Sequence, residues 1–576
     1  MNLPVAALAV LARRALPSRW DLLAALLIFG LLVVLASASR EVARPLSTLA
    51  VHPISLDPGH LPQYAARTTL RMLVAMVLSL LFTFTYATWA AKSRRAELLL
   101  IPLLDILQSV PILGFISITV VFFMSLAPGR ILGAELAAIF AIFTSQAWNM
   151  AFSFYQSLRT VPTELQEAAA NFGLSPWMRF WRLEVPFAMP QLIWNMMMSM
   201  SGGWFFVVAS EAISVGDTTV ALPGVGSYIA LAIERRSLAA IGWAIGTMLI
   251  VILLYDQLLF RPLVAWADRF RFEQEAGVLP PTSWVLTTLR RSRLTIGIAA
   301  AFRFAAEIGG RTRMATPKRS RRQRSAGRSR RADLAWAVLV AVLAGGALWA
   351  VGSFLATGVT IGDLEVALLG GLATMARVFV LIALASVVWV PIGTAVGLRP
   401  GLARMVQPVA QFLAAFPANL VFPLAVAAIA MLQLNPNVWL SPLMILGTQW
   451  YILFNVIAGA AALPSELRDT ARNLRIGGWL WWRKIGLPAV LPYYATGAIT
   501  ASGGSWNASI VAESVSWGDT SLTAFGLGSY IAEATAAGDL HRIVLGIAVM
   551  SAFVVIINRA FWRPLYRYAE RKYRLM

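Results

Sequence analysis

Glu211 and Glu513 are ionisable residues inside long apolar segments, and they stand 302 positions apart. Each follows a run of small residues that ends in tryptophan, at Trp204 and Trp506. Ionisable side chains inside such segments are costly, so they mark a gate, a proton site or an internal pair. We predict that these four residues lie along a translocation pathway, with a structural bond to a neighbouring helix as the open alternative. Bare carboxylates repel anions, so with an anionic cargo they would gate rather than bind.

Amide and indole side chains form a second group of polar residues within apolar segments. Their N–H groups can donate hydrogen bonds to an oxyanion without carrying a charge. We assign five of them to the same pathway: Gln108, Gln146, Asn149, Gln449 and Trp450. Hydrogen bonds between neighbouring helices are the competing interpretation for these side chains.

The sequence carries no pattern typical of catalysis or metal binding. It has no cysteine, so disulfides and thiolate metal sites are excluded. Its three histidines are scattered, at His52, His60 and His541, without metal-ligand spacing. It also has no G-x-x-x-x-G-K-[ST] phosphate loop. We therefore predict that the chain is not an enzyme and holds no cofactor, and that any ATP hydrolysis comes from a separate protein.

The composition predicts an all-α polytopic membrane protein. Hydrophobic residues make up 59% of the chain and the mean hydropathy is +0.70, well above the apolar share of soluble domains. A helix needs about 20 apolar residues to cross a bilayer, and each half offers six such segments. They span 22–38, 66–91, 98–126, 132–154, 187–215 and 238–260, then 334–356, 367–398, 405–432, 438–462, 489–514 and 543–562. The first ends in Ala36-Ser37-Ala38, which is similar to a signal-peptide cleavage site, but we favour an uncleaved anchor.

Positive charge is concentrated between the two halves. The net charge is +21, and residues 261–331 hold seventeen Arg or Lys against four acidic residues. A basic block beside membrane helices marks the cytoplasmic side and a contact with anionic lipids, so we do not expect nucleic-acid binding. With twelve crossings, both termini and this connector are predicted to be cytoplasmic. The expected domains are 1–270, a partly disordered connector at 271–332, and 333–576.

The two halves repeat each other. At an offset of 302, Pro162, Asn171, Trp204 and Glu211 match Pro464, Asn473, Trp506 and Glu513, and Gly226-Ser227-Tyr228-Ile229 matches Gly528-Ser529-Tyr530-Ile531. At an offset of 306, Arg71, Pro102 and Pro111 match Arg377, Pro408 and Pro417. The chain is therefore a tandem duplication of a six-helix unit. Because six crossings return the chain to its starting side, the halves should be related by a pseudo-twofold axis along the membrane normal.

A polar loop with a fixed pattern occurs in each half, at 162–186 and 464–488. The first copy reads Glu167-Ala168-Ala169, then Gly173, Leu183, Val185 and Pro186. The second reads Asp469-Thr470-Ala471, then Arg475, Ile485, Leu487 and Pro488. The pattern resembles the EAA loop, E-A-A-x3-G-x9-I-x-L-P, of the permease subunits of ATP-driven binding-cassette (ABC) importers of type I. Arg475 departs from the glycine of the pattern, which puts the turn geometry of the second copy in question.

This resemblance implies two ATPase subunits, alike or different, that bind ATP and Mg²⁺ and dock on the two loops. The residues it assigns to this coupling are Glu164, Glu167, Ala168, Ala169, Gly173, Glu466, Asp469, Ala471 and Arg475. It also implies an external solute-binding protein and a bacterial inner membrane. The segment Gly526-Leu527-Gly528-Ser529-Tyr530 narrows the resemblance to permeases of the nitrate, sulfonate, taurine and bicarbonate type, so a small oxyanion is the expected cargo.

Two interpretations from other classes compete with an importer permease. An ion-coupled secondary transporter would use Glu211 and Glu513 as proton sites. A lipid-binding scaffold would act through the Arg-rich part of the connector, 318–331.

Overall fold

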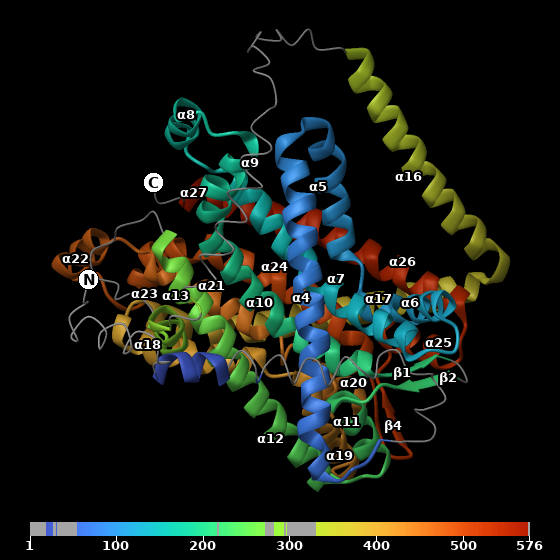
Figure 1. The fold of residues 1–576 in the computed structure, drawn as a ribbon. Coiled ribbons are helices and arrows are strands. Elements are labelled where there is room, and N and C mark those ends of the chain that lie inside the picture. Colours follow the sequence, from blue (N-terminus) through green and yellow to red (C-terminus); the bar gives the residue numbers. More distant parts are fainter. Residues whose placement is uncertain are drawn as a thin grey trace, which may run out of the picture.

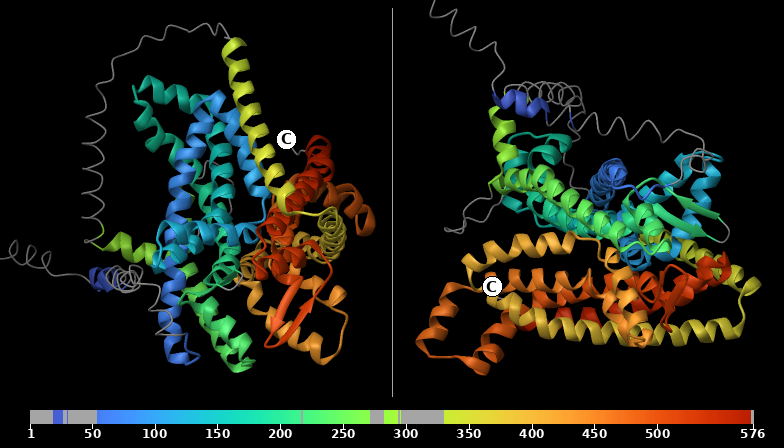
Figure 2. Two further views of the ribbon diagram at one scale, coloured as in Figure 1. Left: turned by 90° about the vertical axis from the view of Figure 1, so that its right-hand side faces the viewer. Right: turned by 90° about the horizontal axis from the view of Figure 1, so that it is seen from below.

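The computed structural model describes residues 19–26, 30, 54–215, 218–270, 282–292, 295 and 330–573. Most of the predicted first segment, 22–38, and most of the connector, 271–332, therefore lie outside the described residues. The two halves of the chain form two helical bundles that lie side by side (Figure 2).

The first bundle is built from six longer helices with short helices and one hairpin between them (Figure 1). The longer helices are α4 (Leu61–Lys92), α5 (Arg94–Ser109), α6 (Ile112–Leu126), α7 (Ile131–Arg159), α10 (Val185–Glu211) and α12 (Leu238–Tyr255). The shorter elements are α8 (Thr163–Asn171), α9 (Pro176–Arg179), β1 (Ala212–Val215), β2 (Thr218–Ala221), α11 (Val225–Glu234), α13 (Arg261–Ala267) and α14 (Trp284–Arg291).

The second bundle repeats this order after one further helix at its start, and the counterpart of α6 is the shorter α19 (Phe422–Met431). Its longer helices are α16 (Arg330–Gly358), α17 (Ile361–Gly397), α18 (Pro400–Ala415), α21 (Gln449–Ala461), α24 (Leu487–Ala512) and α26 (Leu540–Ile557). Its shorter elements are α19 (Phe422–Met431), α20 (Pro436–Trp439), α22 (Ser465–Asn473), α23 (Gly478–Trp481), β3 (Ser514–Trp517), β4 (Thr520–Thr523), α25 (Leu527–Ala536) and α27 (Arg563–Tyr573).

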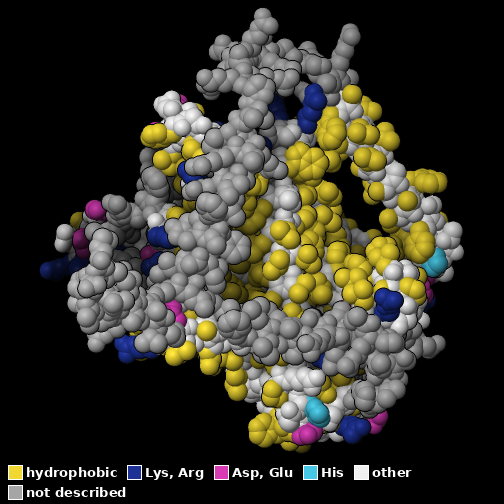
Figure 3. Space-filling view, viewed as in Figure 1, with side chains coloured by type: hydrophobic (Ala, Val, Ile, Leu, Met, Phe, Trp, Pro, Cys, Tyr) yellow, Lys and Arg dark blue, Asp and Glu magenta, His cyan; other side chains and the backbone are white. Residues whose placement is uncertain are grey.

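Among the described residues, seven helices are long and apolar enough to cross a membrane, and two bent helix pairs bring the candidate spans to nine. Figure 3 shows apolar side chains over the middle of one face, with charged side chains gathered toward its ends. This distribution fits a bilayer, because charged groups are placed where water can reach them.

Three of the predicted apolar crossings, 98–126, 405–432 and 438–462, are not single helices in the structure. The first is divided into α5 and α6, the second bends by 67° between two helices, and the third bends by 45°. Pro111 and Pro417 stand at the first two breaks, where the preceding residues are extended. Proline lacks an N–H and disfavours helical backbone in the residue before it, so these helices end there.

Two short antiparallel hairpins, which the sequence patterns did not predict, follow the fifth long helix of each bundle. β1 pairs with β2 with Ala212 opposite Ala221, and β3 pairs with β4 with Ser514 opposite Thr523. The predicted helices at 187–215 and 489–514 therefore end earlier, at Glu211 and Ala512.

Wide π turns recur at matching repeat positions. One pair, Phe180–Glu184 and Trp482–Gly486, precedes the fifth helix of each bundle. The other pair, Asp256–Phe260 and Asn558–Trp562, follows the sixth. A proline stands two residues after each turn and cannot donate the usual backbone bond, which favours a wider turn at that point. The duplication is thus preserved in irregular backbone as well as in sequence.

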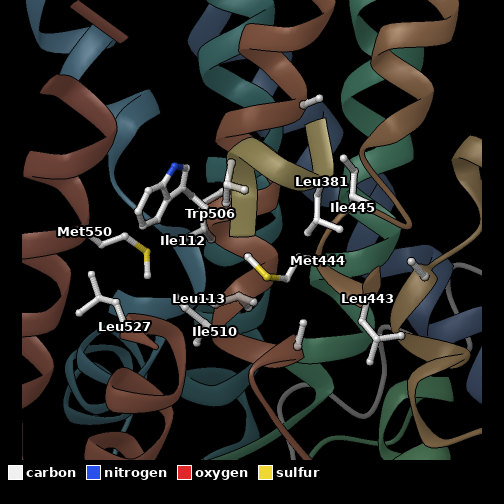
Figure 4. Packing of buried hydrophobic residues seen from close by; sticks show 14 of the residues in the cluster. Ile112, Leu113, Leu381, Leu443, Met444, Ile445, Trp506, Ile510, Leu527 and Met550 are labelled. Atoms are coloured by element: carbon white, nitrogen blue, oxygen red, sulfur yellow. The ribbon is translucent and has the colours of Figure 1, made fainter. Parts of the chain in front are cut away.

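A segment of each bundle packs into the apolar core of the other bundle. Ile112 and Leu113 of α6 pack among Trp506, Ile510 and Met550 of the second bundle (Figure 4). The backbone N–H of Ile112 donates to Oδ1 of Asn507 over 2.7 Å. At the matching place, Nδ2 of Asn419 donates to the carbonyl of Phe205 over 3.3 Å. This reciprocal exchange is what the predicted pseudo-twofold relation requires.

A polar contact joins the two halves near the hairpins. Nη2 of Arg236, just after α11, lies 3.0 Å from Oδ2 of Asp519 in the β3–β4 turn. The backbone N–H of Gly518 donates to the carbonyl of Ile233 over 3.0 Å. Both charged side chains are well exposed, so this contact lies at the surface of the interface.

Gly497 allows α24 to approach α21 closely, and a larger residue there should destabilise the protein. A Cβ atom at Gly497 would lie 2.6 Å from the carbonyl oxygen of Tyr451, a backbone atom that cannot swing away. We expect Gly497→Val to lower the free energy of unfolding by about 1–3 kcal/mol, measured by thermal unfolding in detergent. Gly345→Val is the matched control, because nothing lies within 4 Å of that position. Equal melting temperatures for the two variants would contradict this close packing.

Candidate translocation cavity and coupling loops

A cavity of about 620 Å³ lies between the two bundles and is lined by both. Its wall combines uncharged polar side chains with aromatic and aliphatic ones. From the first half it includes Gln108, Thr144, Ser145, Trp148, Asn149 and Asn195, and from the second half Thr448, Tyr451, Trp506, Asn507, Asn558 and Arg563. Among the described residues that line the cavity, Arg563 carries the one formal charge and no carboxylate is present. We call this space the central cavity.

Three of the predicted pathway residues, Gln108, Asn149 and Trp506, lie on the wall of the central cavity. Nε2 of Gln108 donates to Oδ1 of Asn149 over 2.9 Å, so the two amides face each other across α5 and α7. The pathway role of these residues stays a prediction, and their position is compatible with it.

The other predicted pathway residues do not line this cavity. Gln146 is buried against Met72, with 3.1 Å between Nε2 and Sδ. Trp204 is buried and packs edge-on against Tyr255. Gln449 accepts a hydrogen bond from the indole of Trp389, and Trp450 packs against the same indole. For Gln146 and Gln449, the geometry matches the alternative of contacts between helices.

Glu211 is held by a buried cluster that we call the first carboxylate anchor. One carboxylate oxygen accepts from the hydroxyl of Thr68 over 2.7 Å and from Nη1 of Arg71 over 2.6 Å. The other accepts from the backbone N–H of Gly226 over 2.7 Å. Glu211 is 0% exposed, so these bonds replace the water that the charge has lost. The cluster joins α4, α10 and the start of α11.

The second carboxylate anchor repeats this arrangement around Glu513. One oxygen accepts from Thr374 over 2.8 Å and from Nη1 of Arg377 over 2.9 Å. The other accepts from the backbone N–H groups of Gly528 and Ser529 over 2.8 and 3.3 Å. Each threonine also accepts from the first backbone N–H of the short helix that follows the hairpin.

Glycines make room for both carboxylates. A Cβ atom at Gly224 would lie 2.3 Å from the carboxylate of Glu211, and one at Gly526 would lie 2.2 Å from that of Glu513. The backbone there is extended, so space, not dihedral angle, requires glycine. This explains why the glycine pattern accompanies the glutamates in both halves.

The two anchors differ in one partner of the arginine. Arg71 makes a second, bidentate ion pair with Glu135, at 2.6 and 2.7 Å. At the matching position in the second half stands Asn437, whose Oδ1 accepts from Nη2 of Arg377 over 3.2 Å and from the N–H of Phe525 over 2.8 Å. The first half also has Arg67 near Glu135. The sequence patterns missed Glu135, although its match with Asn437 at offset 302 could have indicated it.

This geometry favours the structural alternative for Glu211 and Glu513. Both are paired with arginine, and neither lies on the wall of the central cavity. Each carboxylate is already engaged by a guanidinium, a threonine hydroxyl and a backbone N–H group. The arrangement therefore does not support proton sites at these positions.

The two loop helices α8 and α22, which we call the coupling helices, have nearly identical backbones. Each is nine residues long and follows a proline, Pro162 or Pro464. Each ends in a left-handed residue, Gly173 with φ of 65° and Arg475 with φ of 51°. The second loop therefore makes the same left-handed turn as the first, although it has arginine in place of glycine. Arg475 adopts a backbone conformation that favours glycine.

The side chains of the coupling helices divide into an exposed and a buried set. Ala169 and Ala471 are buried toward the bundle. The predicted coupling residues Glu164, Glu167, Gly173, Glu466, Asp469 and Arg475 are exposed, and Ala168 is half-buried. Phe172 and Leu474, at matching positions, are 83% and 66% exposed. The sequence patterns did not indicate this exposed apolar pair, although the two residues stand 302 positions apart, as the repeat requires. The coupling role stays a prediction.

The first coupling helix is joined to the bundle by a polar chain. Gln166 accepts from Nη2 of Arg179 over 3.2 Å, and Nε of Arg179 lies 3.1 Å from Glu184. Nζ of Lys92, at the end of α4, lies 2.8 Å from the other oxygen of Glu184. This chain connects α8 to two membrane-spanning helices.

The second coupling helix is supported by apolar packing at the same positions. Trp481 replaces the arginine, Gly486 replaces the buried glutamate, and Leu398 replaces the lysine. A Cβ atom at Gly486 would lie 2.5 Å from the ring of Trp481, so the indole occupies the space that the glutamate takes in the first half.

The fold and these sites define a duplicated, polytopic helical protein with a polar cavity between its halves. Residues 84–264 and 388–575, together well over half of the chain, match the family described as binding-protein-dependent transport system inner membrane component. The chain belongs to this family, which is one of membrane permease subunits of ABC transporters. As a multi-pass member it is an inner membrane protein.

Curated relatives align with about a third of this chain, roughly the length of one of the two matched regions, and the first of them is covered to 64% of its own length. The bicarbonate transport system permease protein CmpB of Synechococcus elongatus is 31% identical over 189 residues, which are 33% of this chain and 64% of the relative. The nitrate import permease protein NrtB of Synechocystis is 26% identical, over 35% of this chain and 70% of the relative. The glycine betaine/carnitine transport permease protein GbuB of Listeria monocytogenes is 26% identical, over 32% and 60%.

Removing the arginine of either anchor should destabilise the protein, and the first anchor should suffer more. Arg71→Met would leave two buried carboxylates without their cation, whereas Arg377→Met would leave one. A broken buried ion pair costs about 3–5 kcal/mol, so we expect a much lower melting temperature for Arg71→Met, measured in detergent by fluorescence. Adding Glu135→Asn should restore part of this loss. The exposed Arg94→Met is the control, and equal losses at Arg71 and Arg377 would contradict the assignment.

The left-handed turn predicts opposite effects at matched positions. Arg475→Gly should stabilise the protein and Gly173→Arg should destabilise it, each by about 1 kcal/mol, because only glycine adopts this conformation without cost. Thermal unfolding of the purified chain, without partners, measures both. A stabilising effect of Gly173→Arg would show that the two turns are not equivalent.

Proposed function

We propose that the chain is the complete membrane pathway of an ATP-driven importer. The observation that carries this proposal is the central cavity between two pseudo-equivalent bundles, each with an exposed coupling helix on a loop between spans. Because both bundles belong to one chain, a single polypeptide does what two separate permease subunits would do.

Two ATPase subunits bind ATP and Mg²⁺ and dock on α8 and α22, while this chain holds no nucleotide. Closure of the ATPase pair draws the coupling helices together, and the bundles rock about the contacts of α6 with α24 and α26 and of α10 with α18. A preference of ATP for one of the two states is what drives the change. The buried alanines and the polar chain from Gln166 to Lys92 support this role, since they make α8 rigid with α4 and α10.

The coupling helices and both termini are assigned to the cytoplasm, and the hairpins with α11 and α25 to the opposite side. The carboxylate anchors lie at the hairpin ends of α10 and α24. They fix α11 and α25 firmly to the bundles, which makes this side a stable platform for a solute-binding protein.

A small oxyanion is the cargo class that the wall of the central cavity fits best. Oxyanions accept several hydrogen bonds, and the wall offers amide, hydroxyl and indole donors with no described carboxylate. In the first half, Arg261 is paired with Asp256 at 3.1 Å. At the matching positions of the second half stand Arg563 and Asn558, both on the cavity wall.

The relatives support this class, since two of those described above are named for bicarbonate and nitrate. The relative named for glycine betaine and carnitine carries a different cargo class, which makes a direct test of charge selectivity necessary. The competing ion-coupled mechanism draws no support from the geometry of Glu211 and Glu513.

Neutralising Arg563 should reduce uptake of an oxyanion. A charge-assisted hydrogen bond contributes about 1.5–3 kcal/mol, so Arg563→Gln should lower uptake of labelled bicarbonate or nitrate by about tenfold or more in cells that carry the complete transporter. Arg559→Gln is the matched control, because Arg559 is exposed one turn away and does not line the cavity. Unchanged oxyanion uptake, or increased uptake of a betaine, would contradict the assigned cargo class.

A further inference from the structure

The coupling helices present the same shape with different charge. α8 and α22 have equal length, the same preceding proline and the same left-handed turn at the end. Each exposes one large apolar side chain before that turn, Phe172 or Leu474. An ATPase cleft shaped for one backbone would therefore accept the other.

The first coupling helix is acidic. Its charged residues are Glu164 and Glu167, both exposed, and no basic residue lies between Thr163 and Asn171. The first arginine that follows it, Arg179, is engaged with Gln166 and Glu184. The surface that α8 offers to a partner therefore carries two negative charges.

The second coupling helix is of mixed charge with a basic end. Glu466 and Asp469 alternate with Arg468 and Arg472, and all four are exposed. The exposed Arg475 then stands in the turn, where the first copy has glycine. Arg472 and Arg475 flank Leu474, so the apolar contact residue has a cation on each side.

Two identical clefts cannot match both surfaces equally well. A basic cleft that attracts the carboxylates of α8 repels the arginines around Leu474, and an acidic cleft does the reverse. Charge complementarity of this kind selects partners more than it adds affinity. The left-handed backbone at Arg475 strengthens the argument, because a strained arginine is retained where glycine would fit better.

We propose that the chain docks two different ATPase subunits, a basic cleft on α8 and an acidic cleft on α22. The inference rests on the proposed importer function. It assigns each ATPase to one half of the chain, so that the fused permease fixes the arrangement of an unlike pair.

Site-specific crosslinking tests this assignment, and the natural absence of cysteine makes the chain suited to it. Phe172→Cys and Leu474→Cys would each be labelled with a short photocrosslinker in the full chain, in membranes of the source cell. Adducts are then identified by mass spectrometry, and a captured protein counts only if it contains a G-x-x-x-x-G-K-[ST] phosphate loop. Asp519→Cys, which is fully exposed near the hairpins, is the control and should capture no ATPase.

We expect the two positions to capture two ATPases of different sequence. The same ATPase at both positions would overturn the inference and leave the importer function intact. No ATPase at either position, or equal capture at Asp519→Cys, would overturn the importer function and the inference with it.

Charge variants make the test specific. Adding Glu164→Gln and Glu167→Gln to Phe172→Cys should reduce its adduct by about threefold to tenfold, as expected for two exposed ion pairs. The same pair added to Leu474→Cys should leave that adduct unchanged. Arg472→Gln with Arg475→Gln should have the converse effect. Equal effects on both adducts would contradict clefts of opposite charge.

Discussion

The structure depends on pairing each buried carboxylate with an arginine. Glu211 and Glu513 are 0% and 1% exposed, so solvent does not reach them and an unpaired charge would cost several kcal/mol. The arginine, the threonine and the backbone N–H groups meet this need at 2.6–3.3 Å. Because those donors come from two elements and the carboxylate stands at the end of a third, satisfying the charge also fixes the hairpin and the helix after it on the bundle.

Matching positions of the two repeats make equivalent contacts with different residue types. Glu135 and Asn437 both bind the anchor arginine, one as an ion pair and one as an amide. Glu184 and Arg179 form an ion pair where Gly486 and Trp481 form an apolar contact. In each case the partners changed together, so the backbone stayed the same while the surface charge of the two halves diverged.

Much of the fold could be predicted from the sequence. Fewer of the residues that line the central cavity or form the carboxylate anchors could be predicted in this way. Hydropathy and the offset of 302 predicted the helical bundles and the positions of both loops, because these depend on local patterns. The sequence does not fix what happens at Pro111 and Pro417, since only packing decides whether a membrane helix with proline bends or breaks. Partners of Glu211 come from α4, 140 residues earlier, and nothing local indicates such a distance. The sequence patterns did not single out Arg563 as a cavity residue, because its place on the cavity wall depends on how the halves meet.

The contact between Arg236 and Asp519 contributes little to how firmly the two halves are held together near the hairpins. Both side chains are well exposed, so water solvates them almost as well as they solvate each other. Parting the bundles on that side is thus resisted mainly by the apolar contacts behind it. The Arg236–Asp519 ion pair can therefore align the hairpin ends of the two halves when they come together. It adds little to the free-energy barrier for separating them.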